Sequence, residues 1–528
     1  MSEVKNLHWA DVAAERLSAR NEKKHIIASG ITPSGEFHIG HLREILTGDM
    51  IARACRERGM DVEFVFIVDT IDPLRKVYPF LSEGYEQYIG HPLARIPAPD
   101  EQGNPNPEGG SYSDYFLKPF LDALQRIGVN PRIIDNHESY CDGKFAQKSR
   151  IACEKANEIR EIIENVSNRE LSDDWFPFNP IGHDGSMDRI TVTGYEWPYV
   201  FWIQDGQEGK SDLREGQGKL PWRVDWPAKW GWIGVTCEPF GKDHGAAGGS
   251  YETGREISLL FDDEPPMPLT YEWISLKGKG AMSSSSGNTI GPLDALDLVP
   301  PEVLRYLIAR AKPSKAIDFD TGMGLVELAD EYERLLERDF ETELANENLS
   351  RRQKVAVESA MGALRMSQIS DIDSEKDSIT FRHLAMVSQI RENEDDIIAT
   401  LGVEKKPYLE LRLKLMKNWI ESEHFPEEML VKILDHPDAS ACSQLEQEHW
   451  ECIESLISNL EKIQWDSDSI GSCIGESARE AGHGPRQAFK ALYTTLMGKD
   501  RGPRLAPVMA AIERKDIIRR LRASLEYR

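Results

Sequence analysis

The chain has 528 residues, of which 40% are hydrophobic and 29% charged, and its formal net charge is -26. This length is too great for one hydrophobic core and predicts about two to four domains in a globular protein. The excess of negative charge argues against nucleic-acid binding through bulk electrostatics, but it leaves room for a basic face on an acidic body.

The N-terminal segment and the apolar runs bear on where the protein resides. We expect a first, amphipathic helix over residues 9–20, and this segment has no apolar signal core. The longest apolar runs, such as 62–68, are strand-sized and far short of the ~20 residues that cross a membrane. The cysteines are scattered without a Cys-x-x-Cys pair, which predicts neither a disulfide framework nor a zinc ribbon. We therefore predict a cytoplasmic protein with no membrane association.

The next three elements form a βαβ unit. Residues 23–30 and 62–70 are apolar runs typical of buried strands, and residues 40–58 between them have helical spacing. Near-continuous apolar strands indicate a parallel sheet that is covered on both faces.

The chain then becomes irregular before further strands follow. Residues 90–115 are rich in Pro, Gly and Asn and predict a surface insertion, and residues 172–232 are aromatic and irregular. The other predicted elements are strands at 131–136, 234–244 and 270–277, helices at 143–167 and 249–261, and a polar loop at 278–288.

Beyond about residue 300 amphipathic helices dominate, with an internal polar loop at 366–379. We predict an α/β domain over residues 1–310 with an insertion at about 75–230, then a connector over 311–345. An all-α domain follows over residues 346–528.

The first candidate site is the stretch SGITPSGEFHIGHLRE. Its turn, Pro33-Ser34-Gly35, leaves a parallel strand, and the following helix is expected to direct free N–H groups and its positive dipole end at an anion. His38 and His41 lie one helical turn apart, so both imidazoles can donate to the same phosphate. The alternative is a capped helix start with incidental histidines.

The second candidate site is the loop KGKGAMSSSSGN. Its serines, its glycines and the lysines Lys277 and Lys279 are donors that suit a lid over a triphosphate. The alternative is a low-complexity linker.

Taken with six further stretches, these motifs resemble the class I lysyl-tRNA synthetases, which are mainly archaeal. The stretches are FIVDTIDPLRKV (66–77), GHPLARIP (90–97), LPWRVDWPAKW (220–230), EPFGKDHGAAGGSYETG (238–254), GNTIGP (287–292) and FKALYTTLMGKDRGPRLAPVMAAIERKDIIRRL (489–521). The resemblance runs from about residue 25 to the end of the chain.

This resemblance implies a Rossmann-like catalytic domain followed by a helical anticodon-binding domain. The implied reaction is ATP-dependent formation of lysyl-adenylate, then transfer of L-lysine to tRNA(Lys). ATP would enter with Mg²⁺. His38, Gly40 and His41 would hold it, and Met282, Ser283, Ser284 and Ser285 would close on its phosphates.

The family's lysine pocket carries over to Gly30, Thr32, Trp222, His244 and Tyr271. Indole and phenol faces suit the four-carbon stem and the ammonium of lysine. A buried ammonium also needs a carboxylate, because leaving it unpaired is costly. We expect this group among Asp69, Asp72 and Asp225, with Asp225 as the first choice.

The chain departs from the family pattern in two places. The second signature loop has Ala281 and Ser284 where lysines are usual, so Lys277 or Lys279 is expected to supply the charge. Some family members have a Cys/His cluster after the Ile-Pro motif. Here residues 98–116 contain neither residue type, so no structural zinc is expected.

Two other functions remain open from the sequence. One is a class I synthetase of the glutamyl-like subgroup, against which the Trp222 and Tyr271 pocket argues because a glutamate pocket needs more cationic donors. The other is a non-catalytic paralogue that binds tRNA or a partner, which only the lysine-poor loop favours. The oligomeric state is open, and a monomer is compatible with the sequence.

Overall fold

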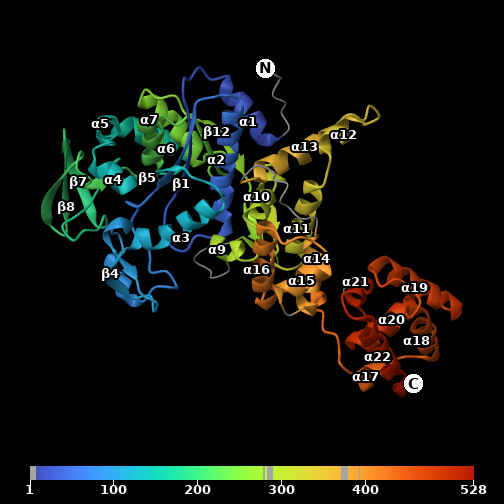
Figure 1. Cartoon of the computed structure of the whole chain (residues 1–528). Coiled ribbons are helices and arrows are strands. Elements are labelled where there is room, and N and C mark those ends of the chain that lie inside the picture. The colour runs from blue at the N-terminus through green and yellow to red at the C-terminus, as the bar shows by residue number, and fades with distance from the viewer. Residues whose placement is uncertain (1–7, 278–279, 282–288, 370–378, 392, 503) are drawn as a thin grey trace. The chain divides into compact units, whose positions relative to one another are not determined.

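The computed structural model describes residues 8–277, 280–281, 289–369, 379–391, 393–502 and 504–528. The chain divides into two compact units (Figure 1). The first takes in residues up to 296, 301–319 and 339–369, and the second takes in 297–300, 320–338 and 370–528. No helix of the described residues is long and apolar enough to cross a membrane.

A five-stranded parallel sheet organises the first unit, in the order β12-β11-β1-β2-β5. Its strands are β1 (His25–Ile31), β2 (Val62–Val68), β5 (Arg132–Asp135), β11 (Cys237–Gly241) and β12 (Met267–Tyr271). The central strands β1, β2 and β11 form here because their side chains are mostly apolar and buried. The parallel direction brings the carboxyl ends of all five strands to one edge.

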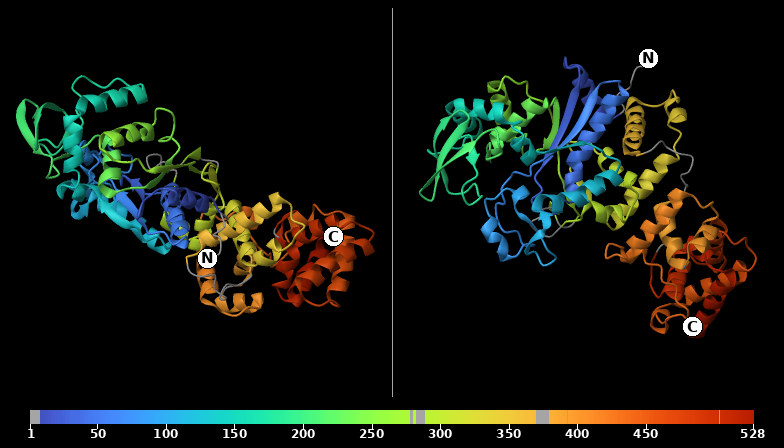
Figure 2. Two further views of the ribbon diagram at one scale, coloured as in Figure 1. Left: turned by 90° about the horizontal axis from the view of Figure 1, so that it is seen from above. Right: turned by 60° about the vertical axis from the view of Figure 1, so that its left-hand side comes forward.

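Helices α2 (Ile39–Glu57) and α7 (Trp222–Ile233) cover opposite faces of this sheet (Figures 1 and 2). On the α2 face, a Cβ at Gly48 would lie only 2.5 Å from the Phe64 ring, so glycine permits the close approach. On the other face, Trp226 of α7 packs in a core with Val65. Phe64 and Val65 are neighbours in β2, and successive strand residues point to opposite faces.

The segment between β2 and β11 carries smaller substructures. The hairpin β3–β4 precedes helix α3, and a three-stranded antiparallel sheet, β7-β8-β9, follows further along. The bounds of the elements in this segment are β3 (Pro97–Pro99), β4 (Pro105–Ser111), α3 (Tyr112–Arg126), α4 (Asn136–Cys141), α5 (Ala146–Glu154), α6 (Ala156–Ser167), β6 (Asn179–Pro180), β7 (Ile190–Glu196), β8 (Tyr199–Gln204), β9 (Gln207–Asp212) and β10 (Gly218–Lys219).

The rest of the first unit contains one small sheet and several helices. The sheet has the order β14-β13-β15, and it places the start of the serine-rich loop next to β13. The elements are α1 (Trp9–Ser18), α8 (Ser250–Leu260), β13 (Ile274–Leu276), β14 (Gly280–Ala281), α9 (Pro292–Leu296), α10 (Pro301–Ala309), β15 (Ile317–Phe319), α12 (Phe340–Leu344) and α13 (Arg351–Ser367).

The second unit is helical in its described part. Buried Arg412 pairs with Glu333, and the Trp419 indole donates to the Thr321 carbonyl at 2.9 Å, which ties α16 to α11 and the segment before it. The helices are α11 (Met323–Leu336), α14 (Phe381–Ile390), α15 (Glu394–Leu401), α16 (Pro407–Glu421), α17 (Ala439–Cys442), α18 (Gln447–Leu460), α19 (Ser467–Glu480), α20 (Pro485–Met497), α21 (Leu505–Ala510) and α22 (Arg514–Ser524).

The fold class predicted from the sequence is confirmed, with three local differences. The helix expected over 143–167 is divided at Lys155 into α5 and α6, and the strand expected over 270–277 is two strands in different sheets. The region 172–232, expected to be irregular, instead contains the sheet β7-β8-β9 and, from Trp222, helix α7, although Pro227 lies inside that helix. Burial of its tryptophans against the sheet outweighs the backbone bond that proline removes. Most of the loop expected over 366–379 lies outside the described residues.

Candidate active site at the carboxyl edge of the sheet

The two histidines of the first motif cap helix α2. His38 is the N-cap residue, and its Nδ1 accepts the Gly40 N–H at 3.1 Å. In return, Nδ1 of His41 accepts the His38 N–H at 3.0 Å. The two imidazoles thus form a reciprocal capping box, a role usually taken by a serine or threonine and a glutamate. Their ring centroids are 4.0 Å apart.

This capping fixes the protonation of both rings. Burial lowers the pKa of His38 to about 4 and that of His41 to about 3, so both imidazoles are neutral at pH 7. Because each Nδ1 accepts a hydrogen bond, each neutral ring carries its hydrogen on Nε2. Neither Nε2 has a partner in the described part of the chain, so both N–H groups are available to a ligand.

We expected free backbone N–H groups at the start of α2 to bind an anion. This expectation is wrong for the first three N–H groups of the helix, because each already makes a hydrogen bond. The Ile39 N–H donates to the Ile290 carbonyl at 3.0 Å, and the His41 N–H donates to the His38 carbonyl at 2.9 Å. The Gly40 N–H is taken by His38. The donors that this helix start offers are therefore imidazole groups.

A cavity opens at the carboxyl edge of the sheet, between β1, β2 and β11. Residues from the strand ends, from α2 and from α7 line it: Gly30, Glu44, Ile67, Asp69, Trp222, Trp226, Lys229, Glu238, Phe240 and His244. Indole faces thus stand beside carboxylates, which suits a ligand with an apolar stem and a cationic end.

Two carboxyl groups in this cavity form no ion pair in the described part of the chain, although the charge of Lys229 acts on Glu238. Glu44 accepts the Gly30 N–H at 2.8 Å and the Tyr271 O–H at 2.8 Å, and burial raises its pKa to about 8. Glu238 accepts the indole N–H groups of Trp226 and Trp230, and burial raises its pKa to about 7. Each group is held in place and prepared to receive a positive charge.

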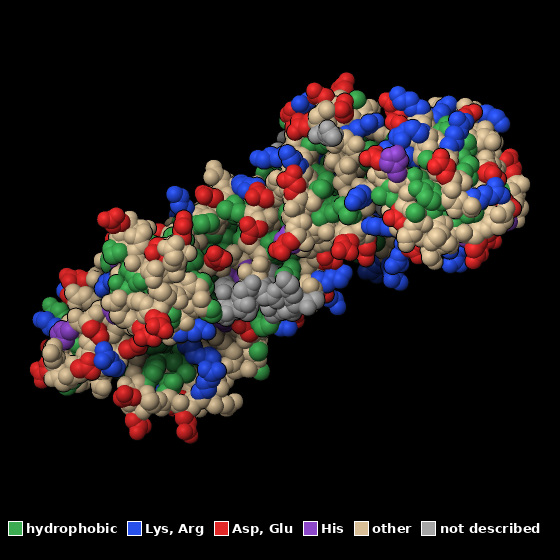
Figure 3. All heavy atoms as spheres, turned by 90° about the horizontal axis from the view of Figure 1, so that it is seen from below, with side chains coloured by type: hydrophobic (Ala, Val, Ile, Leu, Met, Phe, Trp, Pro, Cys, Tyr) green, Lys and Arg blue, Asp and Glu red, His purple; other side chains and the backbone are tan. Residues whose placement is uncertain are grey.

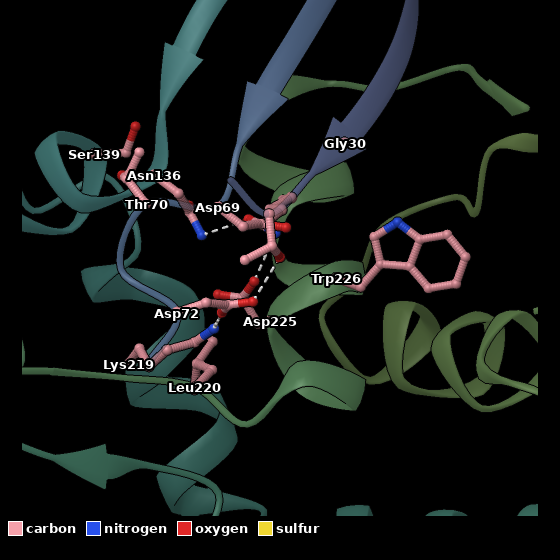
Figure 4. Close-up of polar contacts among 12 residues, drawn as sticks. Gly30, Asp69, Thr70, Asp72, Asn136, Ser139, Lys219, Leu220, Asp225 and Trp226 are labelled. Carbon is pink, nitrogen blue, oxygen red and sulfur yellow. Dashed lines mark hydrogen bonds and ion pairs between the residues drawn. The ribbon is translucent and has the colours of Figure 1, made fainter. Parts of the chain in front are cut away.

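A buried network of three aspartates and two lysines begins at the cavity wall, where Asp69 and Lys229 lie, and extends behind it, as Figure 4 shows in part. Lys229 pairs with both Asp69 and Asp225, and its distance to Asp225 is 2.8 Å. Lys219 pairs with Asp72. With all five groups ionised the network carries one excess negative charge. Burial raises the pKa of Asp69 to about 6, and the negative charges of Asp72 and Asp225 act in the same direction.

Hydrogen bonds complete this network. The Asn136 amide donates to Asp69 at 3.0 Å, the Tyr140 hydroxyl donates to Asp225 at 2.6 Å, and the Thr32 hydroxyl donates to Asp72 at 2.8 Å. Asp225 is fully buried and does not line the cavity. The structure therefore does not place our first choice for the amine ligand at the site, because its oxygens face Lys229 and Tyr140.

The serine-rich loop is described only at its start. Residues 278–279 and 282–288, which include Lys279, Met282, Ser283, Ser284 and Ser285, lie outside the described residues. Lys277 follows β13, and its N–H donates to the Phe319 carbonyl of β15 at 2.9 Å. The small sheet thus fixes the point at which this loop begins.

Two family models match the chain. One, described as tRNA synthetases class I (K), matches residues 7–361, and the other, described as anticodon binding domain, matches residues 405–525. The first match covers more than half of the chain. The chain belongs to the class I tRNA synthetases of the lysine (K) type. This membership confirms the resemblance seen in the motifs.

Several relatives of this synthetase span it almost completely, and each is named lysine–tRNA ligase. That of Thermoplasma volcanium is 37% identical over 98% of this chain and 99% of its own length. That of Thermoplasma acidophilum is 38% identical over 95% of each chain. That of Archaeoglobus fulgidus is 37% identical over 98% of this chain and 100% of its own.

In this class I synthetase the residues predicted to hold the amino acid fall into two groups. Gly30, Asp69, Trp222 and His244 line the cavity, and the other three, Thr32, Asp225 and Tyr271, lie behind it.

Sequence reasoning missed four charged residues of the site. Two carried a usable signal: Glu44 follows His41 by one helical turn, and Lys229 follows Asp225 by four residues, a spacing that pairs side chains on a helix. The other two residues, Glu238 in strand β11 and Lys219 in strand β10, carried a weaker signal in the sequence.

Among the described residues, Glu446, Glu448 and His449 place candidate metal-ligand atoms within 4.8 Å of one another. Of the two ring nitrogens of His449, Nδ1 already accepts the Glu446 N–H at 3.0 Å. The expected lack of a zinc site after the Ile-Pro motif stays a prediction.

Proposed function

We propose that the chain attaches L-lysine to tRNA(Lys) in two steps. Lysine and ATP form lysyl-adenylate and pyrophosphate, and the lysyl group then passes to the tRNA with release of AMP. The observation that carries this proposal is the cavity, in which two carboxyls that form no ion pair with a described residue stand beside two indoles. The relatives named lysine–tRNA ligase support the same substrate.

The amino acid would be read by charge and by shape. The stem of lysine would lie along Trp222 and Trp226, and its ammonium would pair with Glu44, which Tyr271 orients. Glu238 adds a second carboxyl beside the same indoles. Glu44 thus replaces Asp225 as our candidate for the amine ligand, while Asp69 remains a candidate because it also lines the cavity.

ATP would bind where β1 gives way to α2. The Nε2–H groups of His38 and His41 would donate to oxygens that gain charge as pyrophosphate leaves, and the turn Pro33-Ser34-Gly35 would lie along the phosphates. Lys277 and the following loop would complete this site, and Mg²⁺ would enter on the phosphates as part of the substrate.

The tRNA would bind the helical part of the chain with its anticodon. The anticodon-binding family model covers residues 405–525, and Figure 3 shows lysine and arginine side chains gathered on these C-terminal helices, interspersed with acidic ones. These basic side chains can contact the phosphates of the tRNA locally, although the chain as a whole has a net charge of -26. We propose that the protein acts in the cytoplasm and that a monomer is sufficient.

The decisive experiment compares lysine with glutamate. With purified protein we expect ATP–pyrophosphate exchange to depend on lysine and not on glutamate, and lysine to become attached to matched tRNA. Exchange with glutamate would support the glutamyl-like alternative. No exchange with either amino acid, together with retained tRNA binding, would support the non-catalytic paralogue.

A further inference from the structure

Helix α3 of the insertion contacts the turn between β1 and α2. Tyr112 is the first residue of α3 and is fully buried, and its hydroxyl donates to the Ser34 carbonyl at 2.7 Å. Burial raises the pKa of Tyr112 far above its usual value, so the hydroxyl stays protonated and remains a donor at neutral pH. A residue almost 80 positions away in the sequence thus holds one peptide of the motif.

A second contact comes from two helical turns further along α3. Phe120 stacks on Phe37 with ring centroids 4.2 Å apart and an angle of 11° between the planes. It also approaches His41 edge-on at 6.5 Å. Helix α3 therefore contacts the motif at two places, at the turn through Tyr112 and beside the histidine pair through Phe120.

The peptide that Tyr112 holds carries a donor without a partner. In a trans peptide the carbonyl of one residue and the N–H of the next point in opposite directions. The bond from Tyr112 therefore directs the Gly35 N–H away from α3. Gly35 is buried, and its N–H makes no hydrogen bond to any described residue, which is rare for a buried backbone donor.

We propose that Tyr112 is a positioning residue for ATP: its hydroxyl fixes the Ser34–Gly35 peptide so that the Gly35 N–H meets a phosphate oxygen. This inference rests on the proposed ATP site. Among the described residues, no other hydrogen bond reaches Pro33, Ser34 or Gly35 from a distant segment, since the Ser34 N–H bond to the Thr32 carbonyl, at 2.8 Å, is local. Preorganised donors of this kind contribute because they need not be ordered when the ligand arrives.

The test removes one hydroxyl and keeps the ring. Tyr112→Phe is expected to weaken binding of a non-hydrolysable ATP analogue about tenfold, and to raise KM for ATP in pyrophosphate exchange by the same factor. The KM for lysine should stay within about twofold, because the lysine cavity does not contact this turn.

Tyr85→Phe is the matched control. Tyr85 is equally buried, lies 5.8 Å from Tyr112 ring to ring, and donates its hydroxyl to the Pro97 carbonyl at 2.8 Å, away from the motif. Both variants should lose similar thermal stability, but only Tyr112→Phe should lose ATP affinity. Unchanged ATP binding in Tyr112→Phe, or an equal loss in Tyr85→Phe, would overturn the proposal.

The binding measurement separates this inference from the proposed reaction. If the wild-type chain binds the ATP analogue but shows no lysine-dependent exchange, the proposed reaction fails while the role of Tyr112 is still decided by the binding data. If the wild-type chain binds no ATP analogue, both proposals fall. Should Tyr112→Phe not fold, Phe120→Leu removes the second contact between α3 and the motif instead, and the same loss of ATP affinity is expected.

Discussion

Glu44→Gln is expected to raise KM for lysine about 100-fold while leaving KM for ATP nearly unchanged. Glutamine keeps the size of the side chain, and its single oxygen can still accept the Gly30 N–H while its NH2 group faces the oxygen of the Tyr271 hydroxyl, but it removes the charge that the substrate ammonium would meet. Losing the partner of a desolvated cation costs about 3 kcal/mol, which corresponds to about this factor. Lysine-dependent ATP–pyrophosphate exchange measures both constants.

The same substitution changes the pH dependence of lysine binding. Burial raises the pKa of Glu44 to about 8, so in the empty site this carboxyl is mostly protonated at pH 7. Lysine binds as a cation and pairs with the carboxylate, so binding releases a proton. The KM for lysine should therefore fall about tenfold per pH unit as the pH rises from 6 towards 8. In Glu44→Gln this slope should largely disappear.

Two further variants sharpen this test. Glu63→Gln removes a carboxylate at the opposite end of β2, where Glu63 pairs with Lys24 and Arg132, and it should leave KM for lysine unchanged. Glu238→Gln tests the second cavity carboxyl, and because the single oxygen of glutamine can accept only one of the two indole N–H groups, its KM for lysine is compared together with its thermal stability. An unchanged KM for lysine in Glu44→Gln would exclude Glu44 and favour Asp69 as the carboxylate that binds the amine.

The sheet could be predicted from the sequence, but helix α7 could not. The strands are short, apolar runs whose pattern does not depend on the rest of the molecule. Helix α7 contains Pro227, which counts against a helix locally, and it is stabilised by packing Trp226 and Trp230 on the sheet. That packing reaches Val65 and Ala28, about 160 to 200 residues earlier in the chain, so no local pattern reveals it.

The same reasoning separates the predicted from the missed site residues. His38 and His41 stand out because a turn and a helix start surround them, although their capping roles do not follow from residue type, since N-caps are usually Ser, Thr, Asp or Asn. Asp225 carried the sequence signal of an acid among tryptophans. Only the fold shows that Lys229 already neutralises it and that Glu44 instead faces the cavity.

Lys229→Met is expected to cost about 4 kcal/mol of stability, the largest effect on folding among these predictions. Lys229 is the buried cation between Asp69 and Asp225, and its removal leaves two buried carboxylates without their partner. Breaking a buried pair in this way typically costs about 3–5 kcal/mol, because the remaining charge cannot return to water. Urea unfolding followed by tryptophan fluorescence measures the loss, since α7 itself carries tryptophans at the affected site.

Lys24→Met provides the matched control. Lys24 pairs with Glu63 at 2.8 Å, but its side chain is 48% exposed, so its loss should change stability by no more than about 0.5 kcal/mol. If the cost in Lys229→Met arises from unpaired charge, adding Asp225→Asn should recover part of it, because Tyr140 can still donate to the amide oxygen. If instead the cost arises from lost packing of the lysine stem, the double variant will be no more stable than Lys229→Met alone. The network would then be a consequence of the fold and not a device that holds α7 against the carboxyl edge of the sheet.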